Sequence, residues 1–160
     1  MDLKDSNTKI NLMRAFAGES QARNRYTIAG EAAKRQGMYI IKDLFTYTAN
    51  QEKAHAEVFY RALKSCNSDN INIDGGYPVS YYDDVAKLLR AAEHGEFQEY
   101  DDVYPNFAKV AKEEGFIAIS NIFNNIAEIE KKHGERFGKY ADMIEKDTLY
   151  NREEETIWMC

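Results

Sequence analysis

The chain has 160 residues and a formal net charge of −6, with only two prolines and two cysteines. This length suits one domain, and the acidic balance argues against a protein built mainly to bind nucleic acid. No apolar run is long enough to cross a membrane, the N-terminus lacks a signal-peptide hydrophobic region, and two isolated cysteines favour a reducing compartment, so we expect a cytoplasmic protein.

The first half of the chain predicts two long helices followed by an extended segment. Apolar residues recur with a helical period from Thr8 to Gln36, where Ser6 is placed to cap the helix and Gly37 to end it. A second helix is expected from Tyr39 to Ser65. The segment from Cys66 to Pro78 is rich in Asn, Asp and Gly, which predicts an extended connection.

The second half predicts two further helices. One is expected from about Ser80 to Glu114, kinked or loosened by Pro105, and after Gly115 the other runs from Phe116 to about Lys146. Short, long and short connections predict an all-α, ferritin-like four-helix bundle with one long crossover between the second and third helices. A four-helix bundle without any site would show the same periodicity.

This pattern also suggests how the chain divides. We assign residues 1–146 to the bundle and residues 147–160 to a C-terminal tail.

A pattern of glutamate and histidine repeats in the two halves. A Glu-x-x-His motif lies on the second and on the fourth expected helix, and residues three apart share a helix face. A single glutamate lies on the helix before each motif, 33 and 34 residues upstream. The residues are Glu19, Glu52 and His55 in the first half, and Glu96, Glu130 and His133 in the second.

This repeated pattern predicts a metal centre in the interior. Several inward carboxylates would repel one another and lose hydration unless cations lay between them. Carboxylates with imidazoles suit iron or manganese better than a metal that prefers sulfur, and two bridged metals could share the two electrons that reduce an O–O bond. The competing interpretation is a set of solvated helix faces that match by chance. Glu128 falls on a different face from Glu130, and His94 is expected at the surface.

The sequence resembles the rubrerythrin family from about Asn11 to Ala141. The motifs that carry the resemblance are AFAGESQARNRY at 15–26, QEKAHA at 51–56, GEFQEYDDVYP at 95–105 and IAEIEKKHGERF at 126–137.

The resemblance implies further site residues. Glu99 would be a seventh metal ligand, binding one iron in the oxidised state, with His55 replacing it in the reduced state. Tyr26 and Tyr104 match tyrosines that hydrogen-bond ligands or intermediates near the centre, although each could equally be a packed core residue.

The resemblance also implies a function. It indicates a non-haem di-iron peroxidase that reduces hydrogen peroxide to water in oxidative-stress defence, in an NADH- and rubredoxin-linked reaction. Two iron ions are expected, and manganese or a mixed pair would also suit the ligands. The alternative is a ferroxidase or iron-storage protein of the ferritin kind, and a third class is a metal-free interaction bundle.

The resemblance bears on partners as well. Family members are usually dimers, and the long crossover would permit exchange of helix pairs between chains. They commonly carry a rubredoxin domain after the bundle, whereas here the tail stops at Cys160, where such a domain would begin. We therefore expect no rubredoxin-type iron in this chain and an external electron donor such as rubredoxin. Cys66 is expected to pack.

Overall fold

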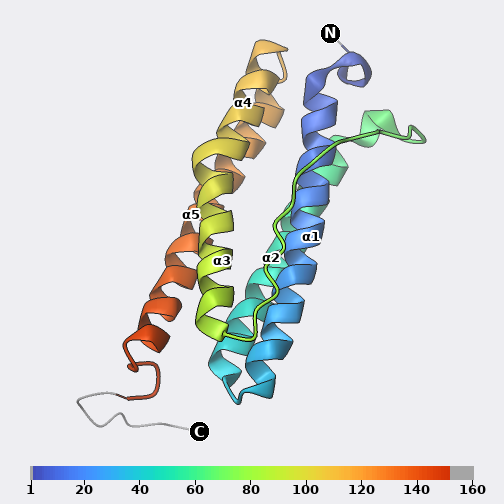
Figure 1. Cartoon of the computed structure of the whole chain (residues 1–160). Coiled ribbons are helices and arrows are strands. Elements are labelled where there is room, and N and C mark those ends of the chain that lie inside the picture. Colours follow the sequence, from blue (N-terminus) through green and yellow to red (C-terminus); the bar gives the residue numbers. More distant parts are fainter. Residues whose placement is uncertain (1, 152–160) are drawn as a thin grey trace, which may run out of the picture.

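The computed structural model describes residues 2–151, and within this range the chain is helical and contains no strand. The helices form a four-helix bundle with one long crossover, which confirms the predicted architecture (Figure 1). Residues 152–160 of the predicted tail, Cys160 among them, lie outside the described residues, so the division at residue 146 stays a prediction. No helix in the described range is both long and apolar enough to cross a membrane.

The first helix pair is α1 (Asn7–Arg35) and α2 (Tyr39–Ala62). The Ser6 hydroxyl accepts a hydrogen bond from the Lys9 backbone N–H at 3.1 Å and caps α1, as predicted. Gly37 has a φ of 76°, a left-handed conformation that ends α1 and turns the chain into α2. Both signals for this helix are local and could therefore be recognised in the sequence.

The chain leaves α2 earlier than expected. The second helix ends at Ala62 rather than Ser65, and a short 3₁₀ turn, η2 (Lys64–Cys66), follows it. Cys66 is buried there among apolar side chains, in agreement with the packing role expected for it. A similar 3₁₀ turn, η1 (Leu3–Asp5), precedes α1.

The crossover runs from residue 67 to residue 84 without regular secondary structure and lies along α1 (Figure 1). An ion pair between Arg14 Nη2 and Asp74 Oδ1, 2.5 Å apart, ties it to that helix. The expected start of the next helix at Ser80 is wrong by five residues. The Asp84 carboxylate accepts the N–H of Ala86 at 2.8 Å and so sets the N-terminus.

The second helix pair contains a break that the sequence only partly predicted. The expected single helix is split by a π-helical turn that ends just before Pro105. A proline ring clashes with the carbonyl four residues earlier, which is that of Asp101, and this residue lies inside the wider turn. The elements are α3 (Val85–Gln98), the π-helical turn η3 (Glu99–Val103), α4 (Tyr104–Glu113) and α5 (Ile117–Glu145).

A charged side chain joins the end of α4 to the start of α1. Glu114, after α4, accepts hydrogen bonds from the backbone N–H of Asn7 at 2.9 Å and of Thr8 at 2.8 Å, at the N-terminus of α1. A carboxylate here satisfies open N–H groups and faces the positive end of the helix dipole. Gly115, with a φ of 90°, then turns the chain into α5.

The apolar core forms two clusters with a polar layer between them. One cluster centres on Tyr26, Phe45, Leu89 and Phe137, and the other on Leu12, Phe59, Tyr104 and Phe123. Along each long helix the apolar face is interrupted once between these clusters, and the glutamates and histidines of the predicted centre occupy that gap. The fold therefore encloses these glutamates and histidines between the two apolar clusters.

Candidate metal centre

The polar layer brings together six of the seven predicted ligands from four helices. All six side chains are buried, with His55 the most accessible at 7%. They form two groups, and in each group the potential ligand atoms lie within 4.8 Å of one another. The groups are Glu19, Glu52, His55 and Glu130, and Glu52, Glu96, Glu130 and His133.

Glu52 and Glu130 belong to both groups and present one oxygen to each histidine. His55 Nδ1 lies 3.2 Å from Glu52 Oε2 and 2.8 Å from Glu130 Oε1. His133 Nδ1 lies 3.1 Å from Glu52 Oε1 and 2.7 Å from Glu130 Oε2. The two imidazole rings are nearly parallel, with centroids 5.7 Å apart. Glu52 and Glu130 could therefore contribute ligand oxygens to both groups.

Most of the oxygen and nitrogen atoms that could bind a metal in this layer have no hydrogen-bond partner. Buried polar atoms normally have a partner, and leaving one without costs about 1–3 kcal/mol. Here the carboxylate oxygens and imidazole nitrogens lie close together but are not oriented for hydrogen bonds, because they converge on shared points. Such convergence is typical of metal ligands. The unpartnered atoms are Glu19 Oε2, both oxygens of Glu52 and of Glu130, Glu96 Oε2, and Nδ1 of His55 and of His133.

The protonation of the metal-free layer reflects the same crowding. Burial, together with neighbouring carboxylates, raises the pKa of Glu19 and of Glu96 well above the ordinary value. Burial would also raise the pKa of Glu52, but the two histidines facing it outweigh burial and lower it to about 2. Burial would lower the pKa of His133, whereas the carboxylates around it raise it to about 12. Bound protons thus offset negative charge of the carboxylates that cations would otherwise neutralise.

Two tyrosines connect the halves of the site. The Tyr26 hydroxyl donates to Glu96 Oε1 at 2.5 Å, and the Tyr104 hydroxyl donates to Glu19 Oε1. Burial and the nearby carboxylates raise the pKa of both phenols, so both stay protonated and act as donors.

The π-helical turn makes these two contacts equivalent. Tyr26 follows Glu19 by seven residues, whereas Tyr104 follows Glu96 by eight. The turn η3 lies within the longer interval and accommodates the additional residue, so that Tyr104 reaches the interior as Tyr26 does. The one-residue difference between the halves therefore has a structural cause.

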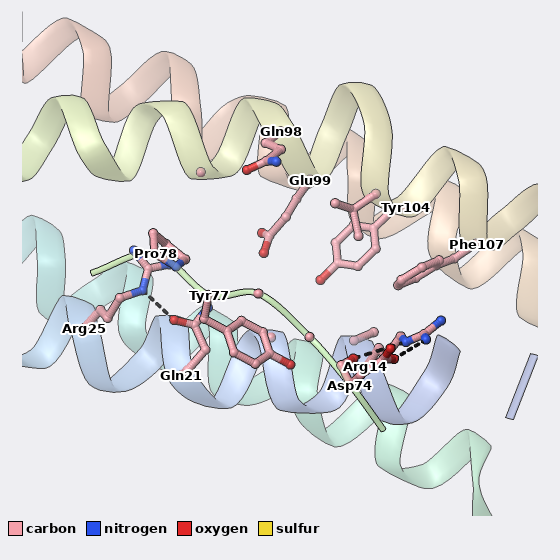
Figure 2. A pocket seen from close by; sticks show the side chains of 16 residues that line it. Arg14, Gln21, Arg25, Asp74, Tyr77, Pro78, Gln98, Glu99, Tyr104 and Phe107 are labelled. Atoms are coloured by element: carbon pink, nitrogen blue, oxygen red, sulfur yellow. Dashed lines mark hydrogen bonds and ion pairs between the residues drawn. The ribbon is translucent and has the colours of Figure 1, made fainter. Parts of the chain in front are cut away.

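Glu99 lies outside both groups. Its side chain extends from η3 toward α1 and the crossover, beside Tyr104, and lines a cavity of about 600 Å³ (Figure 2). Burial and the nearby Glu19 raise its pKa well above the ordinary value. The remaining wall comes from Arg14, Tyr77 and Phe107, among others. The structure thus places Glu99 between the buried layer and an open space.

Residues that the sequence argument set aside lie away from the layer. His94 and Glu128 are exposed, as expected. Gln51 was missed, although its Oε1 lies 3.1 Å from His133 Nε2. The available signal was its position four residues before His55, since residues four apart share a helix face.

This bundle, with carboxylates and imidazoles enclosed between its two helix pairs, defines a ferritin-like protein whose interior could hold metal. The sequence profile described as Rubrerythrin matches residues 11–141. Rubrerythrin-1 of Clostridium acetobutylicum is 40% identical over 159 residues, covering 99% of this chain and 82% of the relative. Rubrerythrin of Nitratidesulfovibrio vulgaris is 40% identical over 158 residues, covering 99% and 81%. The chain belongs to the rubrerythrin family.

A solved structure agrees with this assignment. Nigerythrin in a mixed-valence state superposes with a TM-score of 0.77 at 30% identity, over 88% of this chain and 68% of that one. The ferritin-like fold expected from the sequence is therefore confirmed.

Proposed function

We propose that this protein is a non-haem di-iron peroxidase that reduces hydrogen peroxide to water. The observation that carries the proposal is the pair of four-residue groups sharing Glu52 and Glu130, with buried donor atoms that have no hydrogen bonds. Membership of the rubrerythrin family supports an oxidoreductase. Nigerythrin has also been solved in a fully reduced, all-ferrous state, which supports iron as the metal here.

The ligand roles follow from position. Glu19, Glu52, His55 and Glu130 would hold one iron, and Glu52, Glu96, Glu130 and His133 would hold the other. Bound in this way, the pair of irons would supply the two electrons that reduce the O–O bond of hydrogen peroxide. The reaction also consumes two protons and yields two molecules of water.

The residues at the cavity would manage protons and coordination. Burial and Glu19 raise the pKa of Glu99 and so favour its protonated form, and the side chain lies where a peroxide entering the cavity would arrive. Once that proton is given up, its carboxylate favours the oxidised centre, whereas the neutral imidazole of His55 favours the reduced one. Tyr104 donates to Glu19 and keeps that carboxylate oriented.

The proposal includes an external electron donor. These 160 residues contain two cysteines, too few to form a four-thiolate iron site among themselves, and we propose that a donor such as a rubredoxin supplies the electrons. We also propose a homodimer, in which the crossover would permit exchange of helix pairs. Light scattering at micromolar concentration tests the dimer, and a monomer mass would contradict it.

Stopped-flow mixing separates peroxidase from ferroxidase. The iron-loaded protein is reduced anaerobically and mixed with hydrogen peroxide or with oxygen. We expect faster oxidation by peroxide, with one peroxide consumed per two electrons. Faster oxidation by oxygen, with ferric iron accumulating in the protein, would instead support iron oxidation or storage of the ferritin kind.

A substitution at Glu99 tests its assigned role. Glu99→Ala should retain most iron binding, because the two four-residue groups remain, and should slow oxidation by peroxide by at least tenfold, about 1.4 kcal/mol in activation free energy. The matched control is Glu128→Ala, which removes an exposed acid from the same protein. Equal peroxide kinetics in both variants would refute the role of Glu99.

A further inference from the structure

The two histidines of the metal centre occupy equivalent positions in the repeat but have different surroundings. His55 and His133 each follow their bridging glutamate by three residues, and each presents Nδ1 to both bridging carboxylates. What differs is the far side of each ring, at Nε2. That atom decides which tautomer the ring adopts and how firmly it is held.

Three side chains support His133 on its far side. Its Nε2 lies 3.1 Å from Gln51 Oε1, and Arg136 Nη1 donates to the same Oε1 at 3.4 Å. The Arg136 guanidinium in turn lies 5.2 Å from the centroid of the Tyr47 ring, within range of a cation–π contact. Tyr47 and Gln51 are on α2, whereas Arg136 and His133 are on α5, so the contacts also join the two helix pairs.

This arrangement fixes the direction of each hydrogen bond. Arginine is only a donor, so the amide atom of Gln51 that faces Arg136 must be the oxygen and not the nitrogen. An amide oxygen only accepts, and His133 Nε2 must therefore carry the proton that it shares with Gln51. In a neutral ring Nδ1 is then unprotonated, as a metal ligand must be, and it is the atom that faces the bridging carboxylates.

The other half of the repeat lacks this support. The position equivalent to Gln51 is Ile129, that of Arg136 is Val58, and that of Tyr47 is Asn125. Ile129 and Val58 have no hydrogen-bonding side chain and are 38% and 39% exposed. Within residues 2–151, no protein group hydrogen-bonds to His55 Nε2, whereas its Nδ1 faces the carboxylates of Glu52 and Glu130.

We propose that Gln51 is a positioning residue that holds His133 in the tautomer whose unprotonated Nδ1 faces the metal centre. The proposal rests on the metal binding proposed above and specifies which side chain orients one of its two histidines. Arg136 and Tyr47 act through Gln51 by holding its amide.

Zinc titration and histidine NMR test this proposal without relying on activity. Zinc is diamagnetic and suits mixed carboxylate and imidazole ligands, so metal-free protein is titrated with it by calorimetry and its ¹⁵N-histidine signals are followed. In the wild type we expect two zinc ions and one slowly exchanging Nε2–H signal, from His133. In Gln51→Leu one of the two ions should bind 10- to 100-fold more weakly, and that signal should be lost. Gln51→Glu keeps an acceptor and should restore both.

A second variant tests the same reasoning from the other side. Ile129→Gln places an amide behind His55 and should create a second slowly exchanging Nε2–H signal, with Ile129→Leu as the matched control. Two ions bound with wild-type affinity and an unchanged His133 signal in Gln51→Leu would overturn the proposal. If Gln51→Leu does not fold, the wild-type His133 signal and Ile129→Gln decide the matter. A wild type that binds no metal would instead overturn the metal centre itself.

Discussion

Replacing Glu96 by glutamine should change stability in opposite directions in the metal-free and the metal-loaded protein. Glutamine has nearly the same shape and keeps an oxygen that accepts the Tyr26 hydroxyl, whose bond to Glu96 Oε1 is 2.5 Å long. In the metal-free protein the substitution removes a buried carboxyl whose pKa is raised by burial and by Glu52. In the loaded protein it removes a ligand.

The expected change in melting temperature follows from the two groups of ligands. A metal present at 100 times its dissociation constant stabilises the folded state by about 2.7 kcal/mol per site, and the two groups would supply two sites. At roughly 2–4 °C per kcal/mol for a chain of this size, the loaded wild type should melt about 10–20 °C above the metal-free protein. Glu96→Gln should lose about half of that increment, while its metal-free melting temperature equals or exceeds that of the wild type.

The assay is thermal unfolding followed by circular dichroism, with chelator or with ferrous iron under anaerobic conditions. Glu128→Gln, at an exposed position on α5, is the control and should melt like the wild type in both conditions. A metal-free Glu96→Gln that melts well below the metal-free wild type would refute the argument, because the carboxyl would then stabilise the fold without any cation.

Three further predictions concern stability. In the metal-free protein the folded-state pKa values of Glu19 and Glu96 lie above their ordinary 4.5, and that of His133 above its ordinary 6.5, so the folded state binds more protons than the unfolded one. Its free energy of unfolding should therefore fall as pH rises from 5 to 8, and a rise in urea titrations would contradict this. Glu114→Ala should lower stability by about 1–2 kcal/mol because the N–H groups of Asn7 and Thr8 at the N-terminus of α1 lose their acceptor, while zinc stoichiometry stays unchanged. Phe137→Ala should lower it by about 3–5 kcal/mol, and a loss below 1 kcal/mol in urea unfolding would show that this cluster repacks.

Much of the fold could be predicted from the sequence because the signals that begin and end its helices are local. Ser6 and Gly37 set the bounds of α1 through contacts within one turn, and the prediction was correct to one residue at each end. The start of α3 was missed because Ser80, Asp83 and Asp84 are comparable caps in the sequence, and only the structure shows that Asp84 accepts the N–H of Ala86. The expected weakness near Pro105 is real, but the helix relieves it by widening at η3, one turn before the proline.

The sequence by itself determined which helices carry the acidic and imidazole side chains, since residues three apart on a helix share a face whatever surrounds them. Only the tertiary structure decided which oxygens of Glu52 and Glu130 face which histidine, that Glu99 lies in a cavity beside the six-residue layer, and that Gln51 supports His133. The physical reason is that distances between helices depend on how each helix is rotated and packed against its neighbours. Spacing along the chain does not specify that rotation.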